Sequence, residues 1–357
     1  MPTLFDPLQL GDLHLPNRII MAPLTRNRTA GPGRAPNPMM AQYYAQRASA
    51  GLIISEATSV MPSGVGYPHT PGIWSQEQVQ GWHAVVREVH RAGGRIFSQL
   101  WHVGRISDPS YHDGAAPVAP SAVRPKGHVS LLRPERPYVI PRALSREEIP
   151  GIIAGFRSAA ANAAAAGFDG AELHAANGYL LDQFLQDSTN RRTDEYGGSI
   201  QNRARLLLEV TDAVISVFGR GRVGVHLAPR CDSHDMGDSD PGTLFAYVVE
   251  QLSRRGVAFV CARESLAGSR LGPVLRRLFD GVYIANEGFT AASAAQVLAE
   301  GEADAVAFGK LFIANPDLPR RLREQASLAP WDSSTFYTPG ERGYTDYPSL
   351  EPMSLSA

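Results

Sequence analysis

The sequence predicts an α/β protein whose fold is a closed (β/α)8 TIM barrel, and three observations support this class. Short apolar runs alternate eight times with helical patterns along the 357 residues. These runs are apolar on both faces, as parallel strands covered by helices must be. No composition break or Ser/Gly-rich linker divides the chain. Because eight alternations favour a closed barrel over an open doubly wound sheet, we expect one domain over residues 1–357.

The predicted strands are short runs rich in β-branched and other apolar residues, at 18–22, 52–56, 95–101, 170–174, 223–228, 257–262, 281–285 and 305–308. Amphipathic, often Ala-rich segments predict helices at 39–50, 76–92, 149–166, 202–218, 244–254, 271–279 and 291–299. The helix at 149–166 has the clearest limits. Ser145 and Glu148 have capping-box spacing before it, and Gly167 is a helix-ending residue.

Three segments extend this minimal barrel. Residues 1–17 hold two alternating runs around Gly11 and Asp12, which predict a hairpin that plugs the bottom of the barrel. Residues 103–145 are rich in Pro, Gly and Ser and follow the third strand, so we expect a capping loop at the active-site end. The tail, 330–357, is expected to fold back over the same end.

Charge and composition exclude several classes of protein. The net charge is −1 and Lys and Arg form no runs, which argues against binding to nucleic acid or to an acidic membrane. No apolar run is long enough to span a membrane, and the N-terminus lacks the pattern of a secretory signal. Two cysteines, Cys231 and Cys261, suit a reducing compartment. We therefore expect a cytoplasmic protein, either a monomer or a homodimer.

Polar residues at the predicted strand ends indicate the chemistry, because barrel enzymes place their sites there. No Asp, Glu or His set has metal-ligand spacing, so no metal is expected, and no Ser or Cys lies on a nucleophile elbow. Amides, hydroxyls and ring nitrogens dominate instead, which favours a flat polar ligand. Gly219–Gly224 matches a dinucleotide fingerprint in letters, but a helix precedes it and a strand follows, so it predicts an αβ turn.

The loops after the seventh and eighth predicted strands could hold a phosphate. Many barrels bind phosphate there with backbone N–H groups and a helix N-terminus, and Gly288, Gly309 and Lys310 suit that role. Taken alone, these residues equally suit ordinary loop glycines and a solvated lysine.

Several motifs in order then give a family resemblance. The stretch HAANGYLLDQFLQDSTNRRTDEYGGSIQNRARLL, with IIMAPLTR, ISEAT, FSQLWHVGR, DAVAFGKLFIANPDL and TFYTPGERGYTDYPSL, closely resembles the old yellow enzyme family from Leu4 to Leu350. The resemblance implies a (β/α)8 barrel with non-covalent FMN and with NADPH or NADH as transient hydride donor. It implies reduction of the C=C bond of small electron-poor alkenes, namely α,β-unsaturated carbonyl or nitro compounds. The nicotinamide and the alkene would occupy the same cavity one after the other. A separate binding site for the adenosine part of NADPH or NADH is therefore not needed.

The same resemblance assigns the flavin contacts. Gln99 matches the glutamine whose amide pairs with the pyrimidine end of the ring, and Thr25 matches the threonine that bonds flavin O4. Pro23 and Ala57 match positions whose backbone contacts the flavin ring. Gly288, Gly309 and Lys310 match the positions that bind the phosphate. Without the family pattern, Thr25 could be a strand-end cap and Gln99 a satisfied core amide.

The reacting groups follow the fourth strand. His174, also a cofactor contact, and Asn177 are three residues apart, and one helical turn would project them on the same side toward a substrate carbonyl oxygen. Tyr179 matches the proton donor: hydride passes from flavin N5 to the β-carbon and the phenol protonates the α-carbon. Four aromatic residues are expected to wall the substrate cavity, although aromatic side chains are also common in cores: Tyr67, Trp101, Phe336 and Tyr337.

Three positions depart from the family pattern. His226 stands where relatives have an arginine against the flavin N1/O2 edge, and free imidazole titrates near about 6.5 whereas arginine stays charged. His226 either contacts that edge and stabilises the reduced cofactor when protonated, or leaves the site impaired. Lys310 replaces an arginine and lacks its bidentate fork. Glu287, beside Gly288, is expected to point outward, with repulsion of the phosphate as the alternative.

Two other functions stay open at this stage. The same site could reduce nitrate esters or nitroaromatic compounds, because the hydride source is shared. Alternatively, the barrel could bind FMN or phenols and turn over poorly because of His226 and Glu287.

Overall fold

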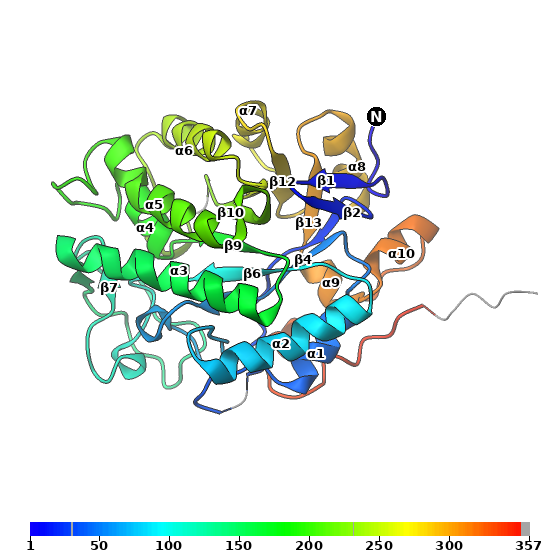
Figure 1. Ribbon diagram of the computed structural model, residues 1–357, viewed down its shortest axis with the longest axis horizontal. Helices are drawn as coiled ribbons and strands as arrows, with labels where there is room; N and C mark the ends of the chain where they lie inside the picture. Colours follow the sequence, from blue (N-terminus) through cyan, green and yellow to red (C-terminus); the bar gives the residue numbers. More distant parts are fainter. Residues whose placement is uncertain (30, 231, 351–357) are drawn as a thin grey trace, which may run out of the picture.

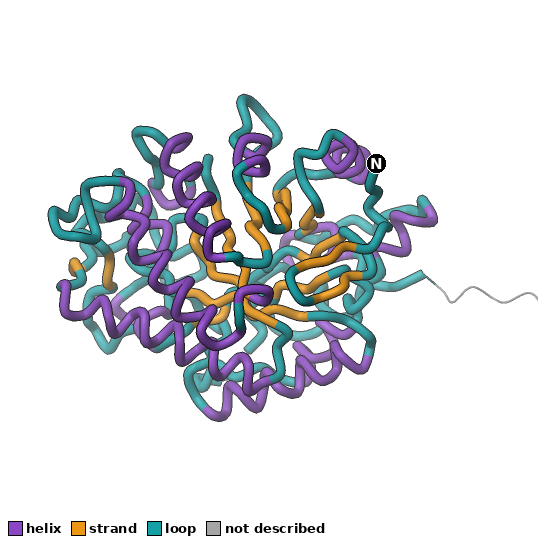
Figure 2. Tube along the Cα trace, turned by 45° about the horizontal axis from the view of Figure 1, so that its top comes forward, coloured by secondary structure: helices purple, strands orange, loops and turns teal. Residues whose placement is uncertain are grey.

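The structure, a computed structural model, describes residues 1–29, 31–230 and 232–350; Cys231 and the tail end at 351–357 lie outside these residues. Within the described residues, eight parallel strands form a closed ring (Figure 1). They pair in the order β4-β3-β13-β12-β11-β10-β9-β6, and a β4–β6 pairing closes the ring. Figure 2 shows the helices on the outside of the strands. The predicted (β/α)8 barrel is confirmed.

The strands lie where the apolar runs predict them, with ends that differ by at most two residues. The barrel strands are β3 (Ile19–Met21), β4 (Leu52–Ile54), β6 (Ile96–Trp101), β9 (Gly170–Ala175), β10 (Val223–Leu227), β11 (Phe259–Arg263), β12 (Val282–Asn286) and β13 (Ala305–Phe308). A further short strand, β5 (Thr58–Ser59), pairs with the C-terminal end of β6.

The helices follow the predicted order. They are α1 (Pro38–Ala45), α2 (Gln76–Arg91), α3 (Ile149–Ala166), α4 (Leu180–Leu185), α5 (Ile200–Phe218), α6 (Pro241–Arg255), α7 (Gly272–Arg277), α8 (Ala291–Ala299), α9 (Lys310–Ala314) and α10 (Leu318–Glu324). Single 3-10 turns lie at Pro62–Gly64, Pro109–Tyr111, Arg146–Glu148, Arg220–Arg222, Ser233–Asp235 and Ser333–Thr335. The Ser145 capping box and the left-handed Gly167 cap are both present. Gly219–Gly224 connects a helix to a strand, as predicted.

Some boundaries were wrong for physical reasons. The first helix ends at Ala45 rather than at residue 50, because Arg47 turns its guanidinium to the carbonyls of Phe312 and Ile313. This tertiary contact overrides the local helical preference. The predicted helix at 271–279 is likewise shorter, and α4, which directly follows Tyr179, was not predicted.

The N-terminal hairpin closes the bottom of the barrel. Its strands, β1 (Leu8–Leu10) and β2 (Leu13–Leu15), are antiparallel. Their leucines join a buried cluster with the lower interior of the barrel, including Phe97 and Phe259. Gly224 makes room for this layer, because a Cβ there would lie 2.1 Å from a Phe259 ring carbon. The bottom of the barrel is therefore apolar and filled.

The other two extensions lie at the opposite end. In the loop after β6, two short strands, β7 (Val118–Ala119) and β8 (Arg142–Ala143), pair in parallel. The tail is held by two arginines shortly after Thr25: Arg26 donates to the carbonyls of Phe336 and Gly343, and Arg28 donates to that of Phe336. The tail therefore lies over the loop after β3. No helix in the described part of the chain is long and apolar enough to cross a membrane.

The hairpin plug gives a prediction about stability. Leu15 is fully buried in the plug, whereas the neighbouring His14 is exposed. Leu15→Ala should lower the free energy of unfolding by about 2–5 kcal/mol, because it leaves a cavity in a packed layer. His14→Ala should change it by less than about 0.5 kcal/mol. Urea unfolding followed by circular dichroism measures both, and equal effects of the two substitutions would show that the hairpin does not plug the barrel.

Candidate active site

Inward-facing side chains at the C-terminal ends of three neighbouring strands bring the predicted cofactor residues together. Gln99 lies on β6 in register with Glu172 on β9, and His174 on β9 lies in register with His226 on β10. All four are buried. The structure thus places the predicted Gln99, His174 and His226 in one polar layer above the apolar plug.

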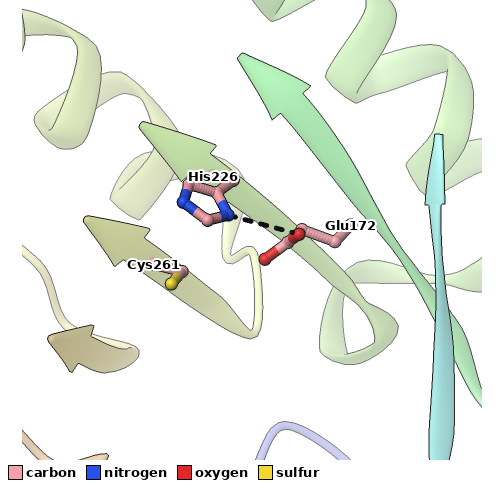
Figure 3. Close-up of side chains that lie close together, drawn as sticks. All are labelled: Glu172, His226 and Cys261. Atoms are coloured by element: carbon pink, nitrogen blue, oxygen red, sulfur yellow. Dashed lines mark ion pairs between the residues drawn. The ribbon is translucent and has the colours of Figure 1, made fainter. Parts of the chain in front are cut away.

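Glu172 is the residue of this layer that the sequence analysis missed. Its Oε2 accepts a hydrogen bond from Gln99 Nε2 at 2.7 Å. The same oxygen lies 3.5 Å from His226 Nδ1 (Figure 3). One buried carboxylate therefore holds both residues that are predicted to meet the pyrimidine edge of a flavin. A signal was available, because Glu172 precedes His174 by two residues and so points to the same side of the strand.

Several buried polar atoms of this layer have no hydrogen-bond partner among the described residues. They are Glu172 Oε1, His174 Nδ1, and both ring nitrogens of His226, of which Nδ1 makes only the 3.5 Å ion-pair contact with Glu172. Buried polar groups are nearly always paired in folded proteins, so this cluster of unsatisfied donors and acceptors indicates a bound polar ligand. Gln99, His174 and His226 thus fit the polar edge of an isoalloxazine ring.

The expectation that no metal-ligating set exists needs a correction. Glu172, His226 and Cys261, on three adjacent strands, bring one potential ligand atom each to within 4.8 Å of one another (Figure 3). Sequence spacing could not show this, because the three residues come from different strands. Burial and the charge of Glu172 raise the pKa of the Cys261 thiol well above its usual range, which keeps it protonated and a poor ligand.

Aromatic rings form the wall around His174. Trp101 stacks on the His174 ring at 6.3 Å between centroids, and Tyr179 meets both rings edge-on at 4.9 Å. Tyr67 stacks on Trp101, and its hydroxyl lies 3.2 Å from that of Tyr179. Burial lowers the pKa of His174 well below its usual value, and the charges of His226 and Arg263 lower it further. His174 is therefore a neutral imidazole beside the phenol of Tyr179.

The predicted geometry of Asn177 was wrong. His174 belongs to β9 and Asn177 has a left-handed backbone with φ 58°, so the two residues do not share a helical turn. The chain turns here through Asn177 and Gly178 before α4 begins. Asn177 Oδ1 accepts a hydrogen bond from Arg263 Nη1 at 2.8 Å, an interaction between distant strands that sequence spacing could not reveal.

The loop after β3 carries two predicted flavin contacts, and a buried acid holds it. Pro23 and Thr25 are partly exposed, and Ala57, beside Glu56, is buried. The backbone N–H of Arg26 donates to Glu56 Oε2 at 3.4 Å. The Tyr44 hydroxyl donates to Glu56 Oε1 at 3.2 Å. Glu56, which follows β4, thereby fixes the backbone directly after Thr25.

The predicted substrate aromatics differ in their surroundings. Tyr67 and Trp101 are buried, whereas Tyr337 is 48% exposed and packs edge-on against Phe336. Burial is the main cause that raises the pKa of Tyr67 well above its usual value, with smaller contributions from Tyr179, Tyr138 and Tyr337. The tail residue Tyr337 therefore lies within electrostatic range of the aromatic wall.

The predicted phosphate residues lie at two adjacent strand ends. Gly288 follows β12 with φ 78°, and Gly309 caps α9, in which Lys310 is the first residue. The Asn286 side chain donates to the Ala307 carbonyl and ties the two strand ends together. Lys310 is exposed and lies 5.9 Å over the Trp331 ring. Glu287, which we expected to point outward, has a side chain that is 39% exposed, and its carboxylate pairs with Arg263 at 2.8 Å.

Comparisons with known proteins match nearly the whole chain. The model of the NADH:flavin oxidoreductase / NADH oxidase family matches residues 3–329. The chain is 45% identical over 364 residues to 12-oxophytodienoate reductase 1 of Oryza sativa subsp. japonica, covering 98% of this chain and 93% of that protein. It is 44% identical over 361 residues to 12-oxophytodienoate reductase 2 of Arabidopsis thaliana, covering 98% and 96%.

Solved structures are similar over the same length. Morphinone reductase in complex with tetrahydroNAD superposes with a TM-score of 0.95 at 50% identity, covering 98% of each chain. The old yellow enzyme homologue from Zymomonas mobilis superposes with a TM-score of 0.95 at 45% identity, covering 98% of this chain and 100% of the other.

The buried acid behind Thr25 gives a prediction about pH. Burial raises the pKa of Glu56 to about 7 from 4.5, so the folded protein keeps its proton at pH values where the unfolded chain has lost it. The contribution of the Glu56 carboxyl to the free energy of unfolding is therefore fully present below about pH 4.5. It decreases as the pH rises toward about 7. Glu56→Gln should flatten this decline.

Thermal unfolding midpoints between about pH 4.5 and pH 7.5 measure the decline. Burial also raises the pKa of Asp182 to about 7. Part of the decline of the unfolding midpoint with pH therefore remains in Glu56→Gln. The exposed Glu300 provides the control, since Glu300→Gln should leave the wild-type slope. If Glu56→Gln and wild type give parallel curves, the Glu56 carboxyl does not titrate as described.

Proposed function

The chain belongs to the NADH:flavin oxidoreductase / NADH oxidase family, and on this basis we propose that it reduces the C=C bond of α,β-unsaturated carbonyl or nitro compounds. It is an FMN-dependent oxidoreductase of the old yellow enzyme type, with a nicotinamide as hydride donor. When bound, FMN supplies the hydride for the β-carbon of the alkene. The remaining work falls to residues of this chain.

The observation that carries the proposal is the group of uncharged donors around one aromatic wall. His174 is a neutral imidazole, and Tyr179 lies edge-on to it at 4.9 Å between ring centroids. Asn177, from the adjoining loop, is the second nitrogen donor. A substrate carbonyl or nitro oxygen that accepts hydrogen bonds from His174 and Asn177 is polarised, because both donors stabilise the negative charge that develops on it during hydride addition.

Tyr179 would complete the reaction as a general acid. Its phenol carries a proton at neutral pH and can protonate the α-carbon while the negative charge collapses from the oxygen. Tyr67 is placed to assist, since its hydroxyl lies 3.2 Å from that of Tyr179. Hydride and proton together account for the two hydrogens that the alkene gains. Trp101 and Tyr67, which stack on each other, would line one side of the substrate, and Phe336 and Tyr337 would approach it from the tail.

On the cofactor side, Gln99 and His226 would meet the pyrimidine edge, and Thr25, Pro23 and Ala57 the opposite edge. Gly288, Gly309 and Lys310 would hold the phosphate. The unsatisfied ring nitrogens of His226 and the orientation of Gln99 by Glu172 support this assignment. The substrates we propose are small electron-poor alkenes, which alternate with NADPH or NADH in the same cavity.

Separate half-reactions test the role of Tyr179. Tyr179→Phe should leave reduction of the bound flavin by NADPH within about threefold of wild type, because no proton is delivered to carbon in that step. Reoxidation by 2-cyclohexenone should slow by about 10²–10⁴-fold. Anaerobic stopped-flow absorbance measures both steps.

Tyr67→Phe is the matched control, since it removes the hydroxyl beside Tyr179 but keeps the Tyr179 phenol. Its reoxidation should slow less than that of Tyr179→Phe. Reoxidation of Tyr179→Phe at the wild-type rate would eliminate Tyr179 as the proton donor.

The flavin midpoint potential tests His226. Its ring is faced by Glu172 and His174 from β9 and by Cys261 from β11. A permanent positive charge beside the pyrimidine edge would favour the reduced cofactor, so the midpoint potential of His226→Arg should be higher than that of the wild type. Potentiometric titration of both proteins at one pH measures this, and equal potentials would reject the proposed contact.

A further inference from the structure

A single guanidinium joins two loops at the mouth of the barrel. Arg263, the last residue of β11, donates from Nη1 to Asn177 Oδ1 and from Nη2 to Glu287 Oε1, both at 2.8 Å. Asn177 follows β9 and Glu287 follows β12, so the side chain connects loops from both sides of its own strand. None of the family motifs quoted above contains Arg263.

Asn177 and Glu287, which Arg263 contacts, have an uncommon backbone conformation. Asn177 has φ 58° and Glu287 has φ 91°. Residues other than glycine are uncommon at positive φ; asparagine is enriched among them, whereas glutamate is not. The Asn177 carbonyl oxygen also lies 2.7 Å from His234 Nδ1. Strained residues of this kind persist where their surroundings fix them, and they concentrate at functional sites.

The contact decides which end of the Asn177 amide is available to a ligand. A guanidinium carries only donors, so it binds the amide oxygen and not the amino group. No hydrogen bond links Asn177 Nδ2 to another residue within 1–29, 31–230 and 232–350. The amino group therefore remains free to donate. If the Asn177 side-chain amide could flip by 180°, its oxygen would face the oxygen of a substrate. The two oxygens would repel each other.

Glu287 in turn holds the guanidinium and balances its charge. The Arg263 side chain is 31% exposed and that of Glu287 is 39% exposed, so the pair lies at the edge of the mouth. The positive charge of Arg263 offsets the negative charge that the Glu287 carboxylate would otherwise present beside Gly288. A neutral pair suits a positioning role better than capture of an anionic substrate.

We propose that Arg263, held by Glu287, is a positioning residue that fixes the Asn177 amide with its N–H group toward the substrate, and so selects substrates whose oxygen accepts a hydrogen bond. This inference rests on the proposed function, because it takes Asn177 as a donor to the substrate oxygen. It deepens that function by naming the group that sets the orientation of the donor. Carbonyl and nitro oxygens meet the requirement.

A double-mutant cycle tests the proposal with the FMN-loaded enzyme and 2-cyclohexenone. Asn177→Ala and Arg263→Met should each lower kcat/KM by about tenfold or more, since each removes an oriented hydrogen bond to the reacting oxygen. The double variant should be no slower than Asn177→Ala alone, because Arg263 acts through the amide. Arg263→Lys keeps a charge and a donor and should recover part of the loss.

Two controls keep the outcomes distinct. The first control measures flavin absorbance per chain and the thermal midpoint, which verify that each variant folds and holds FMN. The second control combines Arg263→Met with Glu287→Gln, so that no unpaired Glu287 carboxylate contributes to the effect of losing Arg263. If the losses from Asn177→Ala and Arg263→Met multiply, or if only Asn177→Ala has an effect, the role of Arg263 is overturned. If Asn177→Ala has no effect, the proposed role of Asn177 in the reaction fails first.

Discussion

Buried polar atoms that the protein leaves without partners are the constraint on which this site depends. Glu172 and the imidazoles of His174 and His226 lie inside the barrel, where an unsatisfied polar group is costly. A bound ligand that supplies donors and acceptors along one edge relieves this cost. The FMN dependence of the family accounts for such a layer, and the proposed position of the cofactor edge follows from it.

The barrel separates stability from chemistry along its axis. The hairpin leucines, Phe97 and Phe259 fill the lower interior with apolar side chains. The polar layer and the aromatic wall of Trp101, Tyr67 and Tyr179 occupy the upper end. Arg26 and Arg28 then fasten the tail over this end through backbone carbonyls. The apolar half therefore supports the strained loops and unpaired groups that the active end requires.

Much of this could be predicted from the sequence, because the information was local. Eight apolar runs, the Ser145 capping box and Gly167 gave the barrel and a helix with both of its ends. The pairing of Gln99 with Glu172, the Arg263 bridge and the meeting of Glu172, His226 and Cys261 were not predicted. Each joins residues from different strands, and only the register of the sheet brings them together. Asn177 was misplaced because its left-handed backbone ends the strand where a helical turn was assumed.

The visible spectrum of the purified protein tests the central claim most directly. Under anaerobic conditions, the yellow FMN-loaded protein should bleach on addition of NADPH and regain its colour when 2-cyclohexenone is added. A protein that neither carries FMN nor takes it up would contradict the cofactor site. A protein that bleaches with NADPH but stays colourless with 2-cyclohexenone would contradict the reduction of alkenes at the end of β9.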